Sequence, residues 1–189
     1  MPSLPLPGVL AALLALFLSA PPATAQVEQG RYLVGINGGF FLQTFEDFDA
    51  QWQLSLAPSV LYLLSDDLAV GGRIGASLNN NPFTAGGNGD LFLTFSVAPA
   101  VRYYFGAPEG NRFFAAATAG VALSSNDLVD PRFEARAGVG YSIFFNDGLA
   151  LEPGINVVYG TGDFDFFQFS VAIGLQGFVD SLGPRRSED

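Results

Sequence analysis

The sequence predicts an all-β protein, a closed eight-stranded antiparallel up-and-down transmembrane β-barrel. Apolar residues recur at every second position in eight segments after residue 30, which is the periodicity of strands. Only 14% of the 189 residues are charged, against roughly 25% in ordinary soluble domains. Turn-like connections of alternating length separate the segments, as expected when hairpins follow one another around a barrel.

The first 25 residues have the features of a signal peptide. Residues 8–20 read GVLAALLALFLSA, an apolar run that is short for a membrane-spanning helix. Because the length disfavours the alternative of a membrane anchor, and small residues precede a cleavage point, we expect cleavage after Ala25. The expected organisation is a cleaved signal peptide at 1–25, a barrel at 26–179 and a polar C-terminal tail at 180–189.

Each predicted strand has bulky apolar residues on one face and small or polar residues on the other. In residues 91–106, Phe95, Val97 and Val101 share one face, whereas Ser96 and Arg102 lie on the opposite face. The same alternation runs through every segment. The predicted strands are residues 31–45, 51–64, 68–78, 91–106, 112–123, 132–145, 149–160 and 166–178.

The composition of the second face predicts which side meets lipid. Alternation alone fits a soluble barrel with an apolar interior equally well, but a water-facing surface would carry Lys, Glu and Thr freely. Here that face holds Gly, Ala and Ser with a few charges, which suits the crowded interior of an eight-stranded barrel. We therefore expect the apolar face to contact lipid. We also expect interior glycines to make room for arginines, namely Gly35, Gly71, Gly75, Gly138, Gly140, Gly154 and Gly174.

Connection lengths predict two different rims. Residues 65–67, 106–111 and 146–148 form short turns, whereas the longer polar connections are residues 45–50, 79–90, 124–131 and 161–165. In the Asn-Asp-Gly turn we expect Phe145 to pair with Leu149 and Gly148 to be left-handed. Interfacial aromatics mark both rims. They are Tyr32, Tyr62, Tyr103 and Phe105 near the short turns, joined by Phe113 and Phe145, and Trp52, Phe133, Tyr159 and Phe167 near the long loops.

Four motifs together resemble a known family. APAVRYYFG, AGVGYSIFF, LEPGINVVYG and the closing FQFSVAIGLQGFV, in this order, resemble the eight-stranded outer-membrane barrels of the OmpA transmembrane domain, OmpX and opacity-protein kind. The resemblance covers residues 30–179 and implies the outer membrane of a Gram-negative cell. It also implies termini and short turns in the periplasm, long loops outside, and contact with membrane lipid, lipopolysaccharide and the barrel-assembly machinery. That machinery usually reads a terminal aromatic residue, whereas here Val179 is in phase and Phe178 is not.

The residue inventory excludes several kinds of chemistry. The chain has no Cys and no His, so it cannot form a disulfide, a Cys/His zinc site or an imidazole base. All eight basic residues are Arg and the net charge is -10, which disfavours a nucleic-acid partner. We expect no cofactor, no metal and no enzymatic activity.

Five inward charged residues are the candidate site. We expect two internal ion-pair clusters that plug the lumen, because an unpaired buried charge is costly. Glu152, Arg102 and Arg73 should share the periplasmic half, with Glu134 and Arg136 nearer the outside. Catalysis by Glu134 and Glu152 is the disfavoured alternative.

Acidic residues gather in the predicted outer loops. They allow divalent-cation binding near lipopolysaccharide, recognition of an unknown extracellular partner, or simply a solvated rim, and no segment has calcium-loop spacing. These residues are Glu46, Asp47, Asp49, Asp90, Asp127, Asp130, Asp163 and Asp165.

The favoured function is a non-enzymatic outer-membrane barrel with a structural or surface-interaction role carried by its loops. The alternatives are a narrow diffusion channel and a soluble periplasmic lipocalin-like barrel. The soluble alternative is disfavoured, because its exposed face would be nearly all apolar.

Overall fold

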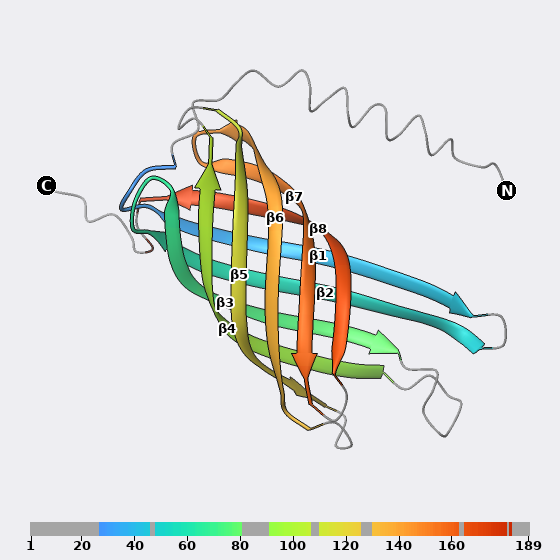
Figure 1. Cartoon of the computed structure of the whole chain (residues 1–189). Coiled ribbons are helices and arrows are strands. Elements are labelled where there is room, and N and C mark those ends of the chain that lie inside the picture. Colours follow the sequence, from blue (N-terminus) through green and yellow to red (C-terminus); the bar gives the residue numbers. More distant parts are fainter. Residues whose placement is uncertain are drawn as a thin grey trace, which may run out of the picture.

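The computed structural model describes residues 27–45, 48–80, 91–106, 110–125, 130–162, 165–180 and 182, without the side chains of 41–45 and 48–51. Eight strands form one closed barrel in sequence order, every neighbouring pair antiparallel (Figure 1). The predicted signal peptide lies outside the described residues. None of the described residues forms a helix long and apolar enough to cross a membrane. The strands are β1 Tyr32–Phe45, β2 Phe48–Leu63, β3 Leu68–Asn80, β4 Leu91–Phe105, β5 Arg112–Ser124, β6 Arg132–Asn146, β7 Leu149–Thr161 and β8 Phe166–Val179.

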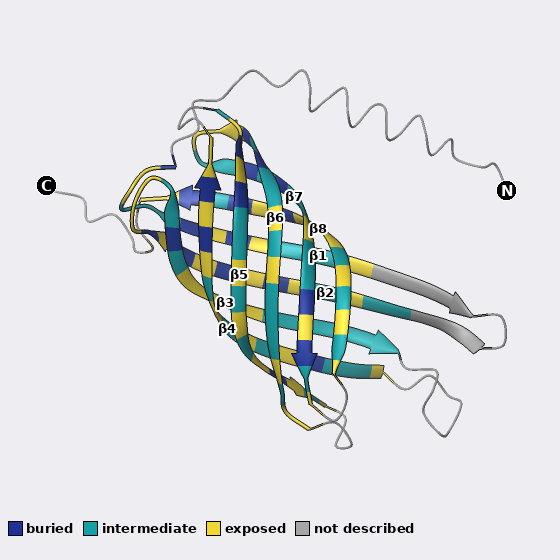
Figure 2. Cartoon of the chain, viewed as in Figure 1, coloured by how far each residue is buried: buried dark blue, intermediate teal, exposed yellow. Residues whose placement is uncertain are grey.

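The apolar face of the strands points outward, so the predicted sidedness is confirmed. Val97, Phe169 and Val171 are 65%, 73% and 74% exposed, whereas the inward Leu33 and Ala69 are fully buried. Buried and exposed residues alternate along the strands (Figure 2). Because the outer surface is a continuous apolar band, a soluble barrel with the same residues inside is excluded.

The connection predicted at residues 45–50 is wrong. β1 runs to Phe45 and β2 begins at Phe48, and these two residues pair at the end of the hairpin. This hairpin extends past its neighbours in Figure 1. Asp49 resembles a loop residue in the sequence, but it belongs to β2, which extends past the neighbouring strands in Figure 1.

The geometry predicted for the Asn-Asp-Gly turn is also wrong. A register shift follows Phe144, so Asn146 rather than Phe145 pairs with Leu149. Gly148 is not among the described glycines with positive φ, which are Gly30, Gly106 and Gly110. The Gly148 amide donates to Asn146 Oδ1 at 2.9 Å, and this Asx-type contact closes the turn without a left-handed residue.

The interior glycines make room for side chains other than arginine, which corrects that prediction. A Cβ at Gly140 would overlap the Phe114 ring, and a Cβ at Gly35 would overlap the Gln176 amide. At Gly71 it would meet the backbone of β2. Aromatic and amide groups therefore fill the space that the sequence reserves, as expected in a barrel this narrow.

Candidate functional site: the barrel lumen

A cluster of buried apolar residues, the apolar floor, fills the short-turn half of the lumen. The Phe144 and Phe178 rings lie 5.2 Å apart, and Tyr104 and Phe114 lie edge to face at 6.2 Å. The alternation of the strands does not by itself predict this floor. Doublets of large residues such as Tyr103-Tyr104 and Phe113-Phe114 were the available signal, because one member of each must point inward. The buried members of the floor are Val27, Leu33, Leu61, Leu63, Ala69, Tyr104, Phe114, Phe144, Ala150 and Phe178.

Arg102 and Glu152 form a buried ion pair directly above this floor. Arg102 Nη1 lies 2.8 Å from both Glu152 carboxylate oxygens, and their side chains are 7% and 1% exposed. The Ser142 hydroxyl donates to Glu152 Oε1 at 2.8 Å, and the guanidinium stacks 4.3 Å from the Phe114 ring centroid. Because β4 and β7 are not neighbours, this pair bridges the lumen.

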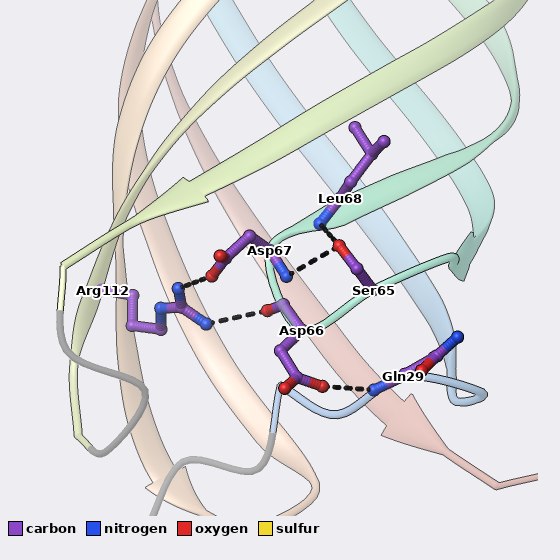
Figure 3. A network of polar contacts seen from close by, with 6 residues as sticks. All are labelled: Gln29, Ser65, Asp66, Asp67, Leu68 and Arg112. Carbon is purple, nitrogen blue, oxygen red and sulfur yellow. Dashed lines mark hydrogen bonds and ion pairs between the residues drawn. The ribbon is translucent and has the colours of Figure 1, made fainter.

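A second arginine, Arg112, ties the floor to the β2–β3 turn. It is almost fully buried, pairs with Asp67, and donates to the Asp66 carbonyl at 2.9 Å (Figure 3). The Asp66 carboxylate in turn accepts a hydrogen bond from the backbone N–H of Gln29 at 2.9 Å. The segment before β1 is thereby fixed beneath the barrel.

Arg31 fixes the opposite side of the same rim. It pairs with Asp180 at 3.0 Å and donates to the Phe178 carbonyl at 2.8 Å. Neither Arg31 nor Arg112 stands out in the sequence, because a charged residue at the start of a strand is typical of a solvated rim.

The structure divides the five predicted residues differently from the sequence. Arg102 and Glu152 come together, but Arg73 forms no described ion pair with them: it lies near the middle of β3, lines the same cavity, and interacts electrostatically with Arg136 and Glu134. The partner of Glu134 is Arg132, at 2.8 Å, rather than Arg136. Alternation predicts the face of the sheet on which a residue lies. The position of that residue along the barrel axis depends on the stagger between the tilted strands, which alternation does not reveal.

Two neighbouring spaces in the lumen share Arg73 and Arg136 in their linings. A cavity of about 110 Å³ lies against Arg73, Arg102, Arg136 and Glu152. A second, of about 140 Å³, lies toward the long loops and is lined by Arg73, Arg132, Glu134 and Arg136. Each space is lined by three arginines and one glutamate, so both spaces carry a net positive charge.

The predicted interfacial aromatics occupy both ends of the barrel exterior. At the short-turn end the Tyr32 and Tyr62 rings lie 5.0 Å apart, and Tyr103 and Phe105 lie 4.9 Å apart. At the other end Tyr159 and Phe133 are exposed. Trp52 there is half-buried.

Most of the acidic loop residues lie outside the described residues: Glu46, Asp47, Asp90, Asp127 and Asp163. Asp49 belongs to β2, and Asp130 and Asp165 are exposed. Asp165 accepts a hydrogen bond from the Tyr159 hydroxyl at 3.1 Å. Within the described part of the chain, no three acidic residues are grouped as metal ligands would be.

The chain forms a closed eight-stranded barrel with an apolar exterior and a filled, charged lumen. These are the features of an eight-stranded outer-membrane barrel. Solved structures share this fold. Neisserial surface protein A is 16% identical with a TM-score of 0.56, and the match covers 81% of this chain and 98% of that one. The N-terminal β-barrel domain of Pseudomonas aeruginosa OprF is 14% identical with a TM-score of 0.52, covering 79% and 98%.

These likenesses show the fold of the chain. No protein-family model and no curated protein matches the sequence. The fold and the apolar belt together place the chain in the outer membrane, in contact with lipid.

Proposed function

We propose that this protein is a non-enzymatic, non-conducting outer-membrane barrel whose structural or surface-interaction role is carried by its extracellular loops. The closed floor of the lumen carries the proposal. Phe114, Phe144 and Phe178 meet beneath the Arg102–Glu152 bridge, and Arg112 ties the turn below them. A barrel filled in this way presents its loops to the outside but offers solutes no continuous path.

The ion pairs support the non-enzymatic part of the proposal. Both inward carboxylates, Glu134 and Glu152, accept from arginines at 2.8 Å. Both carboxylates are thus occupied by arginines, and the chain has no His that could serve as a base instead.

Two partners belong to this proposal: lipopolysaccharide around the barrel, and the assembly machinery that inserts it. The closing strand presents Val179 outward, while Phe178 is buried against Phe144. We propose that the machinery reads this strand through its outward aliphatic and aromatic residues rather than through a terminal aromatic one.

Membrane fractionation with a gel-mobility assay tests the location and the closure of the barrel. The protein should sediment with outer membranes, and the unboiled sample should migrate differently from the boiled one, because a closed barrel resists detergent unfolding. Recovery in the soluble periplasm would contradict the proposal.

Planar-bilayer recording tests the plug. Wild-type protein should give no steady single-channel current. Steady conductance would instead favour the diffusion-channel alternative, with the polar cavity beside Arg73 and Arg136 as part of the pore.

A further inference from the structure

The barrel is not sealed along its whole height between β1 and β8. The two strands pair from Tyr32 with Val179 as far as Gly38 with Ile173, and their pairing ends there. Beyond this point β1 still pairs with β2, and β8 still pairs with β7 up to Phe166. β1 and β8 diverge toward the long-loop end in Figure 1. Hence a lateral gap separates residues 39–45 from residues 166–172.

This gap faces the membrane. Among the described residues, the three most exposed large apolar side chains are Val171 at 74%, Phe169 at 73% and Phe40 at 66%, and all three flank it. Unpaired strand edges occur at hydrocarbon depth only where they are covered or line a polar cavity. The gap therefore needs a polar space behind it.

The central cavity supplies that space. Its lining includes Gly38, Gly39, Val171 and Ala172 at the gap as well as Arg73 deep in the lumen. The cavity of about 110 Å³ can hold a few water molecules or a carboxylate, but not a long acyl chain.

Hydrogen-bond donors converge on this cavity without acceptors. Ser59 Oγ, Arg73 Nε and Arg102 Nε are buried, line the cavity, and have no hydrogen-bond partner among the described residues. Buried donors are almost always satisfied, so unsatisfied donors around one space indicate a ligand that accepts hydrogen bonds.

The charge balance gives the sign of that ligand. Glu152 pairs with Arg102 and Glu134 with Arg132, whereas no described residue forms an ion pair with Arg73 or Arg136. Two guanidinium groups in a confined space favour an anion, and a carboxylate both matches their paired donors and fits a cavity of about 110 Å³.

We propose that the cavity binds the carboxylate head of a single-chain anionic amphiphile. The head lies between Arg73 and Arg136, and the apolar tail leaves the lumen through the gap between β1 and β8. The tail then lies in the membrane against Phe40, Phe169 and Val171. This binding site goes beyond the proposed structural role and does not require a conducting lumen.

Electron paramagnetic resonance of a doxyl-labelled stearate tests the proposal with the full-length protein purified from membranes and placed in phosphatidylcholine nanodiscs. Bound probe should add an immobilised component that protein-free nanodiscs lack. Arg73→Gln/Arg136→Gln should weaken this binding by roughly tenfold or more, the loss expected for one strong charged contact.

Matched controls separate the site from general effects of charge and folding. Arg185→Gln/Arg186→Gln removes the same charge from the C-terminal tail and should bind the probe like wild type. The gel-mobility shift shows that each variant is folded. The methyl ester of the probe, which keeps the tail and lacks the charge, should give no immobilised component.

The gap itself is tested by Gly39→Cys/Ala172→Cys, which introduces the only thiols of the chain. Joining the two thiols, by a disulfide or a short bifunctional reagent, should abolish immobilisation of the probe, and cleaving the link should restore it. Three results would overturn the proposal: wild-type spectra identical to those of empty nanodiscs, equal binding by the Arg73/Arg136 variant, or unchanged binding with the gap linked. Displacement of the probe by acetate at equal concentration would mark a small-anion site instead.

Discussion

Arg102 and Glu152 show how charged groups are accommodated inside a narrow barrel. Their separation of 2.8 Å, the Ser142 hydroxyl and the Tyr104 hydroxyl at 3.2 Å together satisfy most of their polar atoms. Removing one partner is therefore far more costly than removing both, since a lone buried charge keeps its desolvation penalty.

Replacing Glu152 tests this coupling. Glu152→Ala should lower the free energy of unfolding by about 3–5 kcal/mol, because Arg102 is left buried without a counter-charge. Urea titration in lipid vesicles measures the loss. Asp180→Ala, which breaks the exposed Arg31 pair, should cost less than about 1 kcal/mol. Equal losses in the two variants would show that burial does not set the energy.

The same residues show what a sequence reveals about a site. The period of two identifies Arg73, Arg102, Glu134, Arg136 and Glu152 as one set facing inward. It cannot order them along the barrel axis, because that order depends on strand stagger, and so it does not reveal that Arg73 interacts with Arg136 and Glu134 rather than pairing with Glu152. The apolar floor was missed for another reason: its aromatics follow outward aromatics directly and were counted with them.

At the scale of strands, three prolines interrupt the ladders on one side only. Pro58 pairs with Ile36, Pro99 with Gly72 and Pro153 with Ile173, but each leaves a gap toward its other neighbour. Proline lacks the amide hydrogen that such a ladder needs. At the Pro99 gap, Gly120 of β5 comes so close to β4 that a Cβ would overlap the Val97 carbonyl and Ala98.

Gly120→Ala should therefore destabilise the barrel by about 1–3 kcal/mol, the usual cost of forcing extra volume into a packed contact. Gly72→Ala is the matched control, since its Cβ would lie 3.9 Å from the nearest atom, the Ala98 carbonyl oxygen. The midpoint of urea unfolding in vesicles distinguishes the variants. A Gly120→Ala protein as stable as Gly72→Ala would mean that β4 and β5 move apart without cost.

Strand limits could be predicted from the sequence almost throughout, because lipid on one side and a crowded lumen on the other enforce strict alternation. The prediction failed where neither environment acts. The outer end of the β1–β2 hairpin lies beyond the belt and needs no apolar face, and the Asn146 bulge is set by local hydrogen bonding. The gap between β1 and β8 leaves no trace in either strand's own pattern.

At the scale of the whole molecule, the sign of the charge changes between outside and inside. The chain carries a net charge of -10, yet the lumen holds Arg73, Arg102, Arg132 and Arg136 against Glu134 and Glu152. The arginine excess is thus confined to a narrow space, where a field acts strongly on any ion that enters.

If the apolar floor is opened, the positive charge of the lumen should appear as selectivity for anions. Phe114→Ala/Phe144→Ala removes two rings of the plug and should produce small conductance events that wild type lacks. Their reversal potential across a KCl gradient should favour chloride despite the acidic chain. Phe169→Ala, on the lipid face, should remain silent. Cation selectivity in the opened variant would contradict the assignment of charge to the lumen.

The enclosure of the arginines also bears on proteolysis. Every arginine that the structure describes is buried or half-buried within the barrel or its short-turn rim. Since the chain has no lysine, trypsin has no other basic side chain to recognise between residues 27 and 180. Folded barrels should survive trypsin digestion as one large fragment, whereas unfolded chains should be cleaved to short peptides. Trypsin digestion alone therefore measures the fraction of a preparation that has folded into closed barrels.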